Sequence, residues 1–235
     1  MRHWTWCLAF LVAAAAAGPA SADVVTITLD TGNPGISAYT GPYGTVSVDL
    51  TSSTIAKIKL TSNTVGGNIY LFGSGETIAL NVNATTFSAS NIVASNAGTG
   101  FSSPVPFTLG SGNADGLGKY SLTIKSFDGF THSSDTLTLT LTNSSGAWAS
   151  AADVLTANAS GYLVAAHVFV TPNPADTSNG ALATGYAAGD SIDDPWLTPA
   201  PSSLVLMGIG GLGIGGFFWR RSRRTRVIAA ARQAA

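Results

Sequence analysis

The sequence has almost no cysteine. Its one cysteine, Cys7, lies in an apolar N-terminal segment, so the chain from residue 23 onward contains none. This absence excludes disulfides, a thiolate nucleophile and cysteine-based metal sites in that part of the chain. Histidine and glutamate are nearly as scarce, because only His132 and His167 follow the N-terminal segment and Glu76 is the sole glutamate. Few side chains therefore remain for acid–base chemistry.

Positive charge is also missing from most of the chain. Between Asp23 and Trp196 there are four lysines and no arginine against all twelve acidic residues, a net charge of −8. An acidic domain repels the phosphates of nucleic acids, so we expect no nucleic-acid partner. Charged residues make up only 10% of the chain, while small polar residues are abundant, as is typical of exported surface proteins.

The N-terminal segment has the features of a signal peptide over residues 1–22. A basic start precedes an apolar run over 4–17, and the small residues Ala20 and Ala22 occupy the positions that a signal peptidase reads. We expect signal peptidase to cleave before Asp23. The alternative is an uncleaved anchor, for which the apolar run is short.

After residue 22 the dominant pattern is an alternation of apolar and polar residues, which predicts β-strands. The clearest example is TLTLTLT at 136–142, with leucines facing inward and threonines outward. In 55–61, Lys57 and Lys59 share one face, which predicts a half-solvated or edge strand. Strands are expected at 24–30, 45–50, 55–61, 68–72, 77–83, 85–93, 119–126, 136–142, 162–170 and 181–187.

Glycine-rich turns separate these segments, and this arrangement predicts an all-β domain over 23–188. An antiparallel β-sandwich, jelly-roll-like in its topology, fits many short strands joined by tight turns. Residues 146–158 have helical spacing and predict one short helix. Residues 189–198 contain three aspartates and a proline and predict a linker.

The C-terminal segment predicts a single transmembrane helix over 202–219. Its eighteen residues carry no charge and would span about 27 Å at about 1.5 Å per residue. The basic segment that follows would stay in the cytoplasm with the tail 225–235, which leaves the β-domain outside. It consists of Arg220, Arg221, Arg223, Arg224 and Arg226.

Residues 199–224 resemble the PEP-CTERM sorting signal of exported bacterial proteins. Pro199, Pro201 and the two following serines match the PEPSS pattern, and the apolar span and arginines match the rest. Ala200 stands where the family usually has glutamate. The resemblance implies recognition by an exosortase-like membrane enzyme and anchoring in the inner membrane through lipid contacts of 202–219. Tail processing would then release the domain to the cell surface or extracellular matrix, where exopolysaccharide is a candidate partner.

No catalytic site or cofactor is predicted, and the chain is expected not to be an enzyme. His132 has Ser133, Ser134 and Asp135 beside it in sequence, but a catalytic triad depends on geometry rather than on neighbours, and no G-x-S-x-G elbow is present. Glu76 is expected to cap a hairpin turn, and His167 to pack within a strand. No metal ligands are assigned, although calcium binding stays open at two aspartate groups: Asp115, Asp128 and Asp135, or Asp190, Asp193 and Asp194.

Two functions fit these features. The first is a structural or adhesive envelope protein without catalysis, and the alternative is a glycan-binding β-sandwich. An aligned row of exposed aromatic rings across one sheet face would favour the second, whereas a hydrolase would need serine, histidine and acid groups converging in a pocket. The available rings are Tyr39, Tyr43, Phe101, Phe130, Trp148, Tyr162 and Tyr186.

Overall fold

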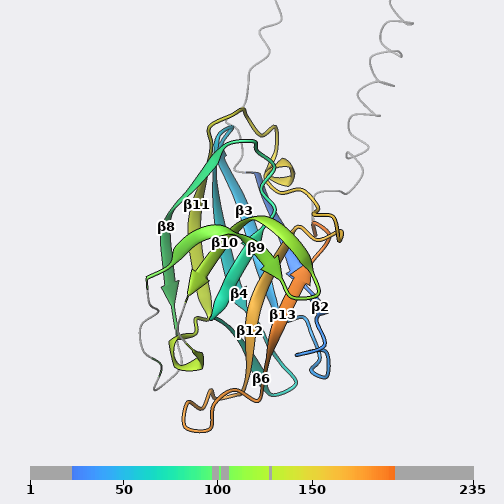
Figure 1. Ribbon diagram of the computed structural model, residues 1–235, viewed down its shortest axis with the longest axis vertical. Helices are drawn as coiled ribbons and strands as arrows, with labels where there is room; N and C mark the ends of the chain where they lie inside the picture. Colours follow the sequence, from blue (N-terminus) through green and yellow to red (C-terminus); the bar gives the residue numbers. More distant parts are fainter. Residues whose placement is uncertain (1–22, 97–100, 102–105, 127–128, 194–235) are drawn as a thin grey trace, which may run out of the picture. The chain divides into compact units, whose positions relative to one another are not determined.

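Two antiparallel β-sheets form the domain that the computed structural model describes over residues 23–96, 101, 106–126 and 129–193 (Figure 1). Within these residues the helices are limited to two short 3-10 turns, η1 (Phe130–His132) and η2 (Ala151–Asp153). The predicted all-β, antiparallel class is confirmed.

Sheet A contains the segments with the strictest alternation. Each of its central strands buries apolar residues at every second position and directs mostly serine, threonine or lysine, with Asp49 in β3, to the opposite, more accessible side. Its strands follow the order β1 (Asp23–Leu29), β3 (Gly44–Ser52), β4 (Ile55–Ser62), β11 (Thr136–Asn143) and β8 (Phe87–Ser95).

Sheet B is more apolar and less regular. Its main path is β2 (Thr31–Gly32), β13 (Ala183–Gly189), β12 (Val164–Pro172), β7 (Gly75–Leu80), β10 (Gly118–Ser126) and β9 (Thr108–Ala114). In addition, β6 (Asn68–Phe72) pairs with β12, and β5 (Thr64–Val65) pairs with β6.

One hydrophobic core lies between the two sheets. Sheet A contributes Ile27, Leu60 and Leu139, for example, and sheet B contributes Phe72 and Ile78, all at most 2% exposed. Because both inner faces supply this cluster, the sheets pack face to face as a β-sandwich.

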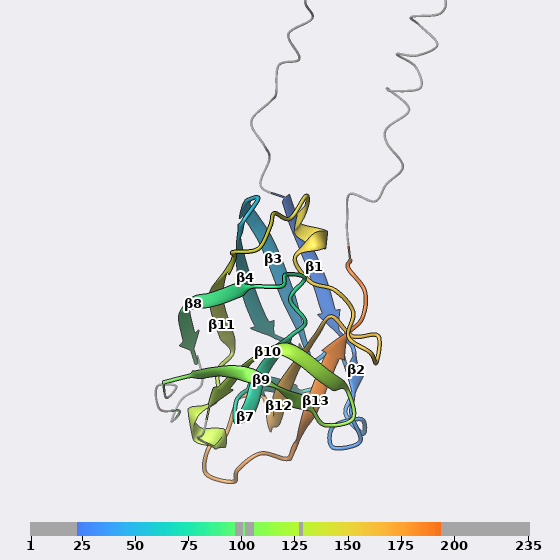
Figure 2. The same cartoon turned by 45° about the horizontal axis from the view of Figure 1, so that its top comes forward.

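The β9–β10 hairpin forms one edge of sheet B and bends back across the outer face of the rest of that sheet, as Figures 1 and 2 both show. Shifts in register on both sides of β10 mark the bend that takes it there. Tyr120 of β10 packs in a second buried cluster with Ala79, Ala165 and Ala188, whose small side chains leave room for its ring. Sheet B is therefore covered on its outer side at this end, and sheet A has no such cover among the described residues.

One expectation about local structure is wrong, and for another the structure decides between two alternatives. The segment 146–158 forms only the short turn η2, because its backbone bonds to another segment: the Asn83 N–H donates to the Val154 carbonyl, and Asn81 accepts from Thr156. The segment 55–61 is half-solvated as expected but is not an edge strand. It is β4, with β3 on one side and β11 on the other.

The predicted signal peptide 1–22, the sorting tripeptide at 199–201, the span 202–219 and the tail 225–235 lie outside the described residues. Near the end of the described domain, β13 extends to Gly189, and the Asp193 N–H donates to the Thr26 carbonyl at 2.7 Å. No helix in the described part of the chain is long and apolar enough to cross a membrane.

Candidate ligand-binding surfaces

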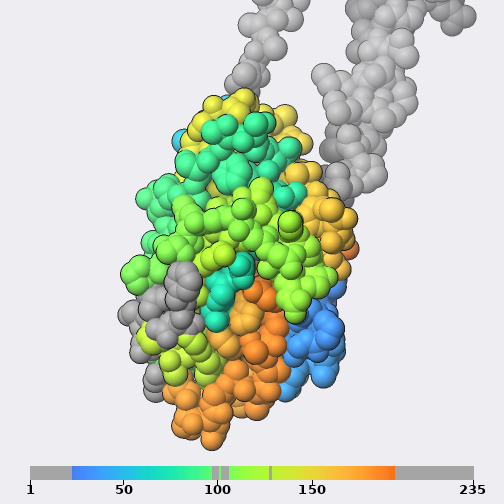
Figure 3. All heavy atoms as spheres, in the orientation of Figure 1, coloured from blue at the N-terminus to red at the C-terminus, as the bar shows by residue number. Residues whose placement is uncertain are grey.

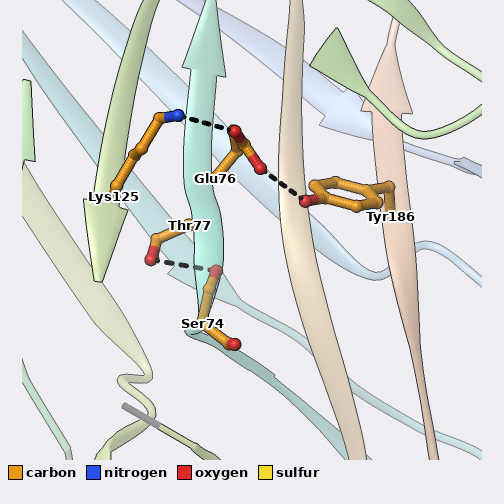
Figure 4. A network of polar contacts seen from close by, with 5 residues as sticks. All are labelled: Ser74, Glu76, Thr77, Lys125 and Tyr186. Atoms are coloured by element: carbon orange, nitrogen blue, oxygen red, sulfur yellow. Dashed lines mark hydrogen bonds and ion pairs between the residues drawn. The ribbon is translucent and has the colours of Figure 1, made fainter. Parts of the chain in front are cut away.

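A polar network joins three strands on the outer face of sheet B (Figure 4). Glu76 of β7 accepts from the Lys125 ammonium of β10 at 2.9 Å and from the Tyr186 hydroxyl of β13 at 3.2 Å. Gly112 of β9 lies over the carboxylate, since a Cβ there would be 3.1 Å from Glu76 Oε1. Glu76 lies in a strand and not at the cap of a turn, so that expectation is wrong.

The charge of Glu76 is stabilised by these partners. Burial raises the pKa of the carboxyl, but hydrogen bonds from Lys125, the backbone and Tyr186 lower it by more, so the pKa lies below its usual value. Burial together with the nearby Glu76 carboxylate raises the pKa of Tyr186 to about 12. Both groups are thus fixed in one protonation state at neutral pH, which suits a structural clamp better than proton transfer.

A continuous row of rings crosses the same face. Phe101, Phe130, Phe169, His167 and Tyr186 meet in sequence with centroid distances of 5.2, 5.6, 5.1 and 4.8 Å, and each contact is edge to face. Figure 3 shows this side of the molecule, with the green hairpin above the orange strands β12 and β13. Because the rings pack edge to face against one another, with Phe169 only 8% exposed and the other four half-buried, they offer no open row of flat ring faces for stacking.

His167 lies in β12, as expected, and is held on both ring nitrogens. Nδ1 contacts the Gly73 carbonyl, and Nε2 lies 3.0 Å from the Thr184 hydroxyl. Burial lowers the pKa of this imidazole, and the Gly73 contact and Glu76 only partly oppose that effect. His167 is therefore neutral in the folded protein at pH 7.

The serine, histidine and aspartate neighbours at 132–135 are not brought into a triad by their described contacts. Ser133 is fully buried, and its hydroxyl donates to the Phe130 carbonyl at 2.7 Å. The Asp135 carboxylate accepts from Ser95. These groups thus anchor the turn η1 and the end of β11.

Each of the two aspartate groups considered for calcium has one member outside the described residues, Asp128 in the first and Asp194 in the second. Asp193 accepts from the Thr28 hydroxyl at 2.5 Å, and Asp135 is bound to Ser95. Among the described residues, no three histidine, cysteine or acidic side chains lie close enough to hold a metal ion.

Two of the other expected aromatic residues, Trp148 and Tyr43, are buried inside the fold, while Tyr39 and Tyr162 are half-buried. Trp148 is 3% exposed and donates its indole N–H to the Asn83 carbonyl at 2.8 Å. Tyr43 is also 3% exposed and packs edge to face on Tyr70 at 5.0 Å. Neither ring is available to a ligand.

A cavity of about 650 Å³ lies beside Trp148 at one end of the sandwich. Its amide groups already have partners within the chain: Asn83 donates to the Asp153 carbonyl, and the Asn143 side chain accepts from the Ser145 N–H. These amide groups therefore hold the surrounding loops in place.

A trough of about 530 Å³ lies on the outer face of sheet A, and the sequence pattern did not predict it. It crosses β3, β4 and β11, so its wall is set by the cross-strand register, which pairs Ser47 with Lys59 and Asp49 with Lys57. The polar wall consists of Ser47, Asp49, Lys57, Lys59, Thr138 and Thr140. Asn91, at a positive φ of 52° in the irregular part of β8, adds an amide at its margin.

Several trough side chains have no acceptor or donor within the fold. Among the described residues the lysines at 57 and 59 form no salt bridge, and both are exposed. Asp49 Oδ1 is buried and has no hydrogen-bond partner in the described structure. A buried acceptor without a donor is costly to the fold.

Comparison with known proteins gives no relative: no protein-family model, curated protein or solved structure matches the chain.

Proposed function

We propose that this chain is an exported cell-envelope or extracellular-matrix protein with a structural or adhesive, non-enzymatic domain. The observation that carries the proposal is the order of features in the chain: a signal-peptide-like start, an acidic β-domain, and a tail over 199–224 that resembles the PEP-CTERM signal. The sandwich, for which we propose jelly-roll-like topology, would be the part displayed outside the membrane.

The described side chains support a non-catalytic domain. Glu76, His167 and Ser133 are each engaged in contacts that hold strands or turns together. These contacts give each group a role in holding the fold, which supports a structural interpretation of the domain. The second candidate, a glycan-binding module, is favoured by the polar trough on sheet A and not by the aromatic row.

The intact mass of the protein from its native envelope tests the proposal. A chain that begins at Asp23 and ends near Pro201 is expected if signal peptidase and an exosortase-like enzyme both act. A chain that extends to Ala235 would show that the tail is a plain membrane anchor, because Ala200 has replaced the glutamate that the enzyme recognises. A chain that retains residues 1–22 would contradict cleavage of the signal peptide.

A further inference from the structure

The loop between β12 and β13 contains the one Asn-Gly pair of the chain, Asn179 and Gly180. The loop covers residues 173–182 and extends beyond the ends of both strands, at the bottom of Figure 1. Asparagine before glycine is prone to lose its side-chain amide, because glycine has no Cβ to keep its backbone nitrogen away from the preceding side chain. The fold decides whether the two groups can meet.

The surroundings of Gly180 leave them free to do so. Its backbone has a positive φ of 71°, and a Cβ placed on it would have no atom within 4 Å. Its N–H donates to no group in the described structure, whereas the nearby Leu182 N–H is held by the Val170 carbonyl at 2.8 Å. Asn179 is exposed, so water and hydroxide reach its side chain. Both reacting groups are therefore accessible in the folded domain.

We infer that Asn179 is a site of spontaneous deamidation, with the backbone nitrogen of Gly180 as the nucleophile and water as the co-reactant. The nitrogen bonds to Cγ of Asn179, the Cγ–Nδ2 bond breaks, and ammonia leaves with the proton that the nitrogen has lost. Water then adds to either carbonyl of the five-membered succinimide and yields aspartate or isoaspartate. The reaction needs no enzyme, because one chain already holds the two groups together.

The product would reverse a contact in this loop. The Asn179 amide donates to Asp176 Oδ2 at 2.7 Å, and the other oxygen of Asp176 accepts from the Ser178 N–H at 2.8 Å. Hydrogen bonds from Ser178 lower the pKa of Asp176, which is therefore ionised at neutral pH. A carboxylate at position 179 would face this carboxylate, so attraction becomes repulsion. Deamidation thus loosens the turn and takes the net charge of the domain from −8 to −9.

Asn143 provides a control within the same molecule. It precedes another small residue, Ser144, but it is only 6% exposed. Its side-chain oxygen accepts from the Ser145 N–H at 3.0 Å, and the Ser144 N–H, which would be the nucleophile, donates to the Thr86 carbonyl at 2.9 Å. Because both reacting groups are held, Asn143 should stay intact while Asn179 converts.

The test is incubation of the purified full chain in detergent at mildly alkaline pH, followed over time by protease digestion and mass spectrometry. The same chain unfolded in urea gives the reference rate. We expect Asn179 to convert in the folded chain within about tenfold of that rate, with both aspartate and isoaspartate formed. Conversion should accelerate with pH, because the attacking nitrogen must lose its proton. Asn179→Gln is the matched variant: it keeps the amide but would need a six-membered ring, so it should stay intact.

Three results would overturn the inference. Conversion more than about a hundredfold slower in the folded chain than in urea would show that the loop keeps the two groups apart. Product without isoaspartate would exclude the cyclic route, and conversion of Asn143 as fast as Asn179 would show that the fold does not select the site. In Asn179→Asp, the Ser178 amide hydrogen should exchange faster than in the wild type, and unchanged exchange would contradict the loosened turn. None of these results depends on export or tail processing.

Discussion

Replacement of Glu76 by glutamine offers the most direct test of the network on sheet B. The carboxylate accepts from Lys125 at 2.9 Å and from Tyr186 at 3.2 Å, with the Glu76 and Lys125 side chains 21% and 31% exposed. At this distance and an effective dielectric constant of about 20, the attraction alone is about 6 kcal/mol. Desolvation and solvent screening offset most of it, and measured exposed pairs retain about 0.2–1 kcal/mol.

The charged hydrogen bond from Tyr186 adds to this amount, and glutamine keeps only a weaker neutral form of it. We expect Glu76→Gln to lower the free energy of unfolding by about 1–2 kcal/mol at about pH 7. The measurement is urea unfolding of the purified protein followed by far-ultraviolet circular dichroism. Asp190→Asn, which removes an exposed charge, is the matched control and should change stability little.

The pH dependence makes this prediction specific. The folded pKa of Glu76 lies below its unfolded value of 4.5, so the folded state binds fewer protons in this range. Its contribution to stability is therefore fully present above about pH 4.5 and is lost as the pH falls through the folded pKa. The stability curves for the wild type and Glu76→Gln should converge as the pH falls through the folded pKa of Glu76. A difference that stays constant with pH, or equal stability at pH 7, would refute the assigned role.

Three further predictions concern other contacts. Burial lowers the pKa of His167, so stability falls as the pH drops from 6.5 through the folded pKa of this imidazole. In urea titrations between about pH 7 and 5 the wild type should therefore lose more stability than His167→Gln, and parallel curves would contradict this. Trp148→Phe leaves the Asn83 carbonyl without its donor and should cost about 1–3 kcal/mol in the same assay, with an unchanged midpoint counting against the contact. Gly44→Ala would place a Cβ 2.8 Å from a buried phenylalanine ring and 2.9 Å from a backbone oxygen, so it should lower the melting temperature, whereas Gly146→Ala has open space and should not.

The regular strands could be predicted from local pattern because their burial is local. TLTLTLT at 136–142 became β11 with every leucine buried, since a period of two puts alternate residues on one face regardless of what the partner strand is. β9 (Thr108–Ala114) was not predicted, because its glycine-rich sequence has no alternation and it becomes a strand only by pairing with β10.

The grouping of side chains on the candidate surfaces could not be predicted from the sequence. Glu76 is 49 residues from its partner Lys125 and 110 from Tyr186, so no local pattern could join them. The lysines at 57 and 59 did signal a solvated strand face. Their place at the centre of a sheet depended on β4 pairing with β11, which lies far along the chain.

The sequence by itself determined which kinds of chemistry the domain lacks and which face of each regular strand is buried. With no cysteine after residue 22 and one glutamate in all, it excluded disulfides and thiol chemistry, and its alternation set which side chains would be buried. Only the tertiary structure decided which exposed groups meet: it placed the rings of sheet B in a self-packed row and left the trough of sheet A open. The physical reason is that burial pattern follows the local period of the backbone, whereas the grouping of polar side chains follows the register between strands distant in sequence.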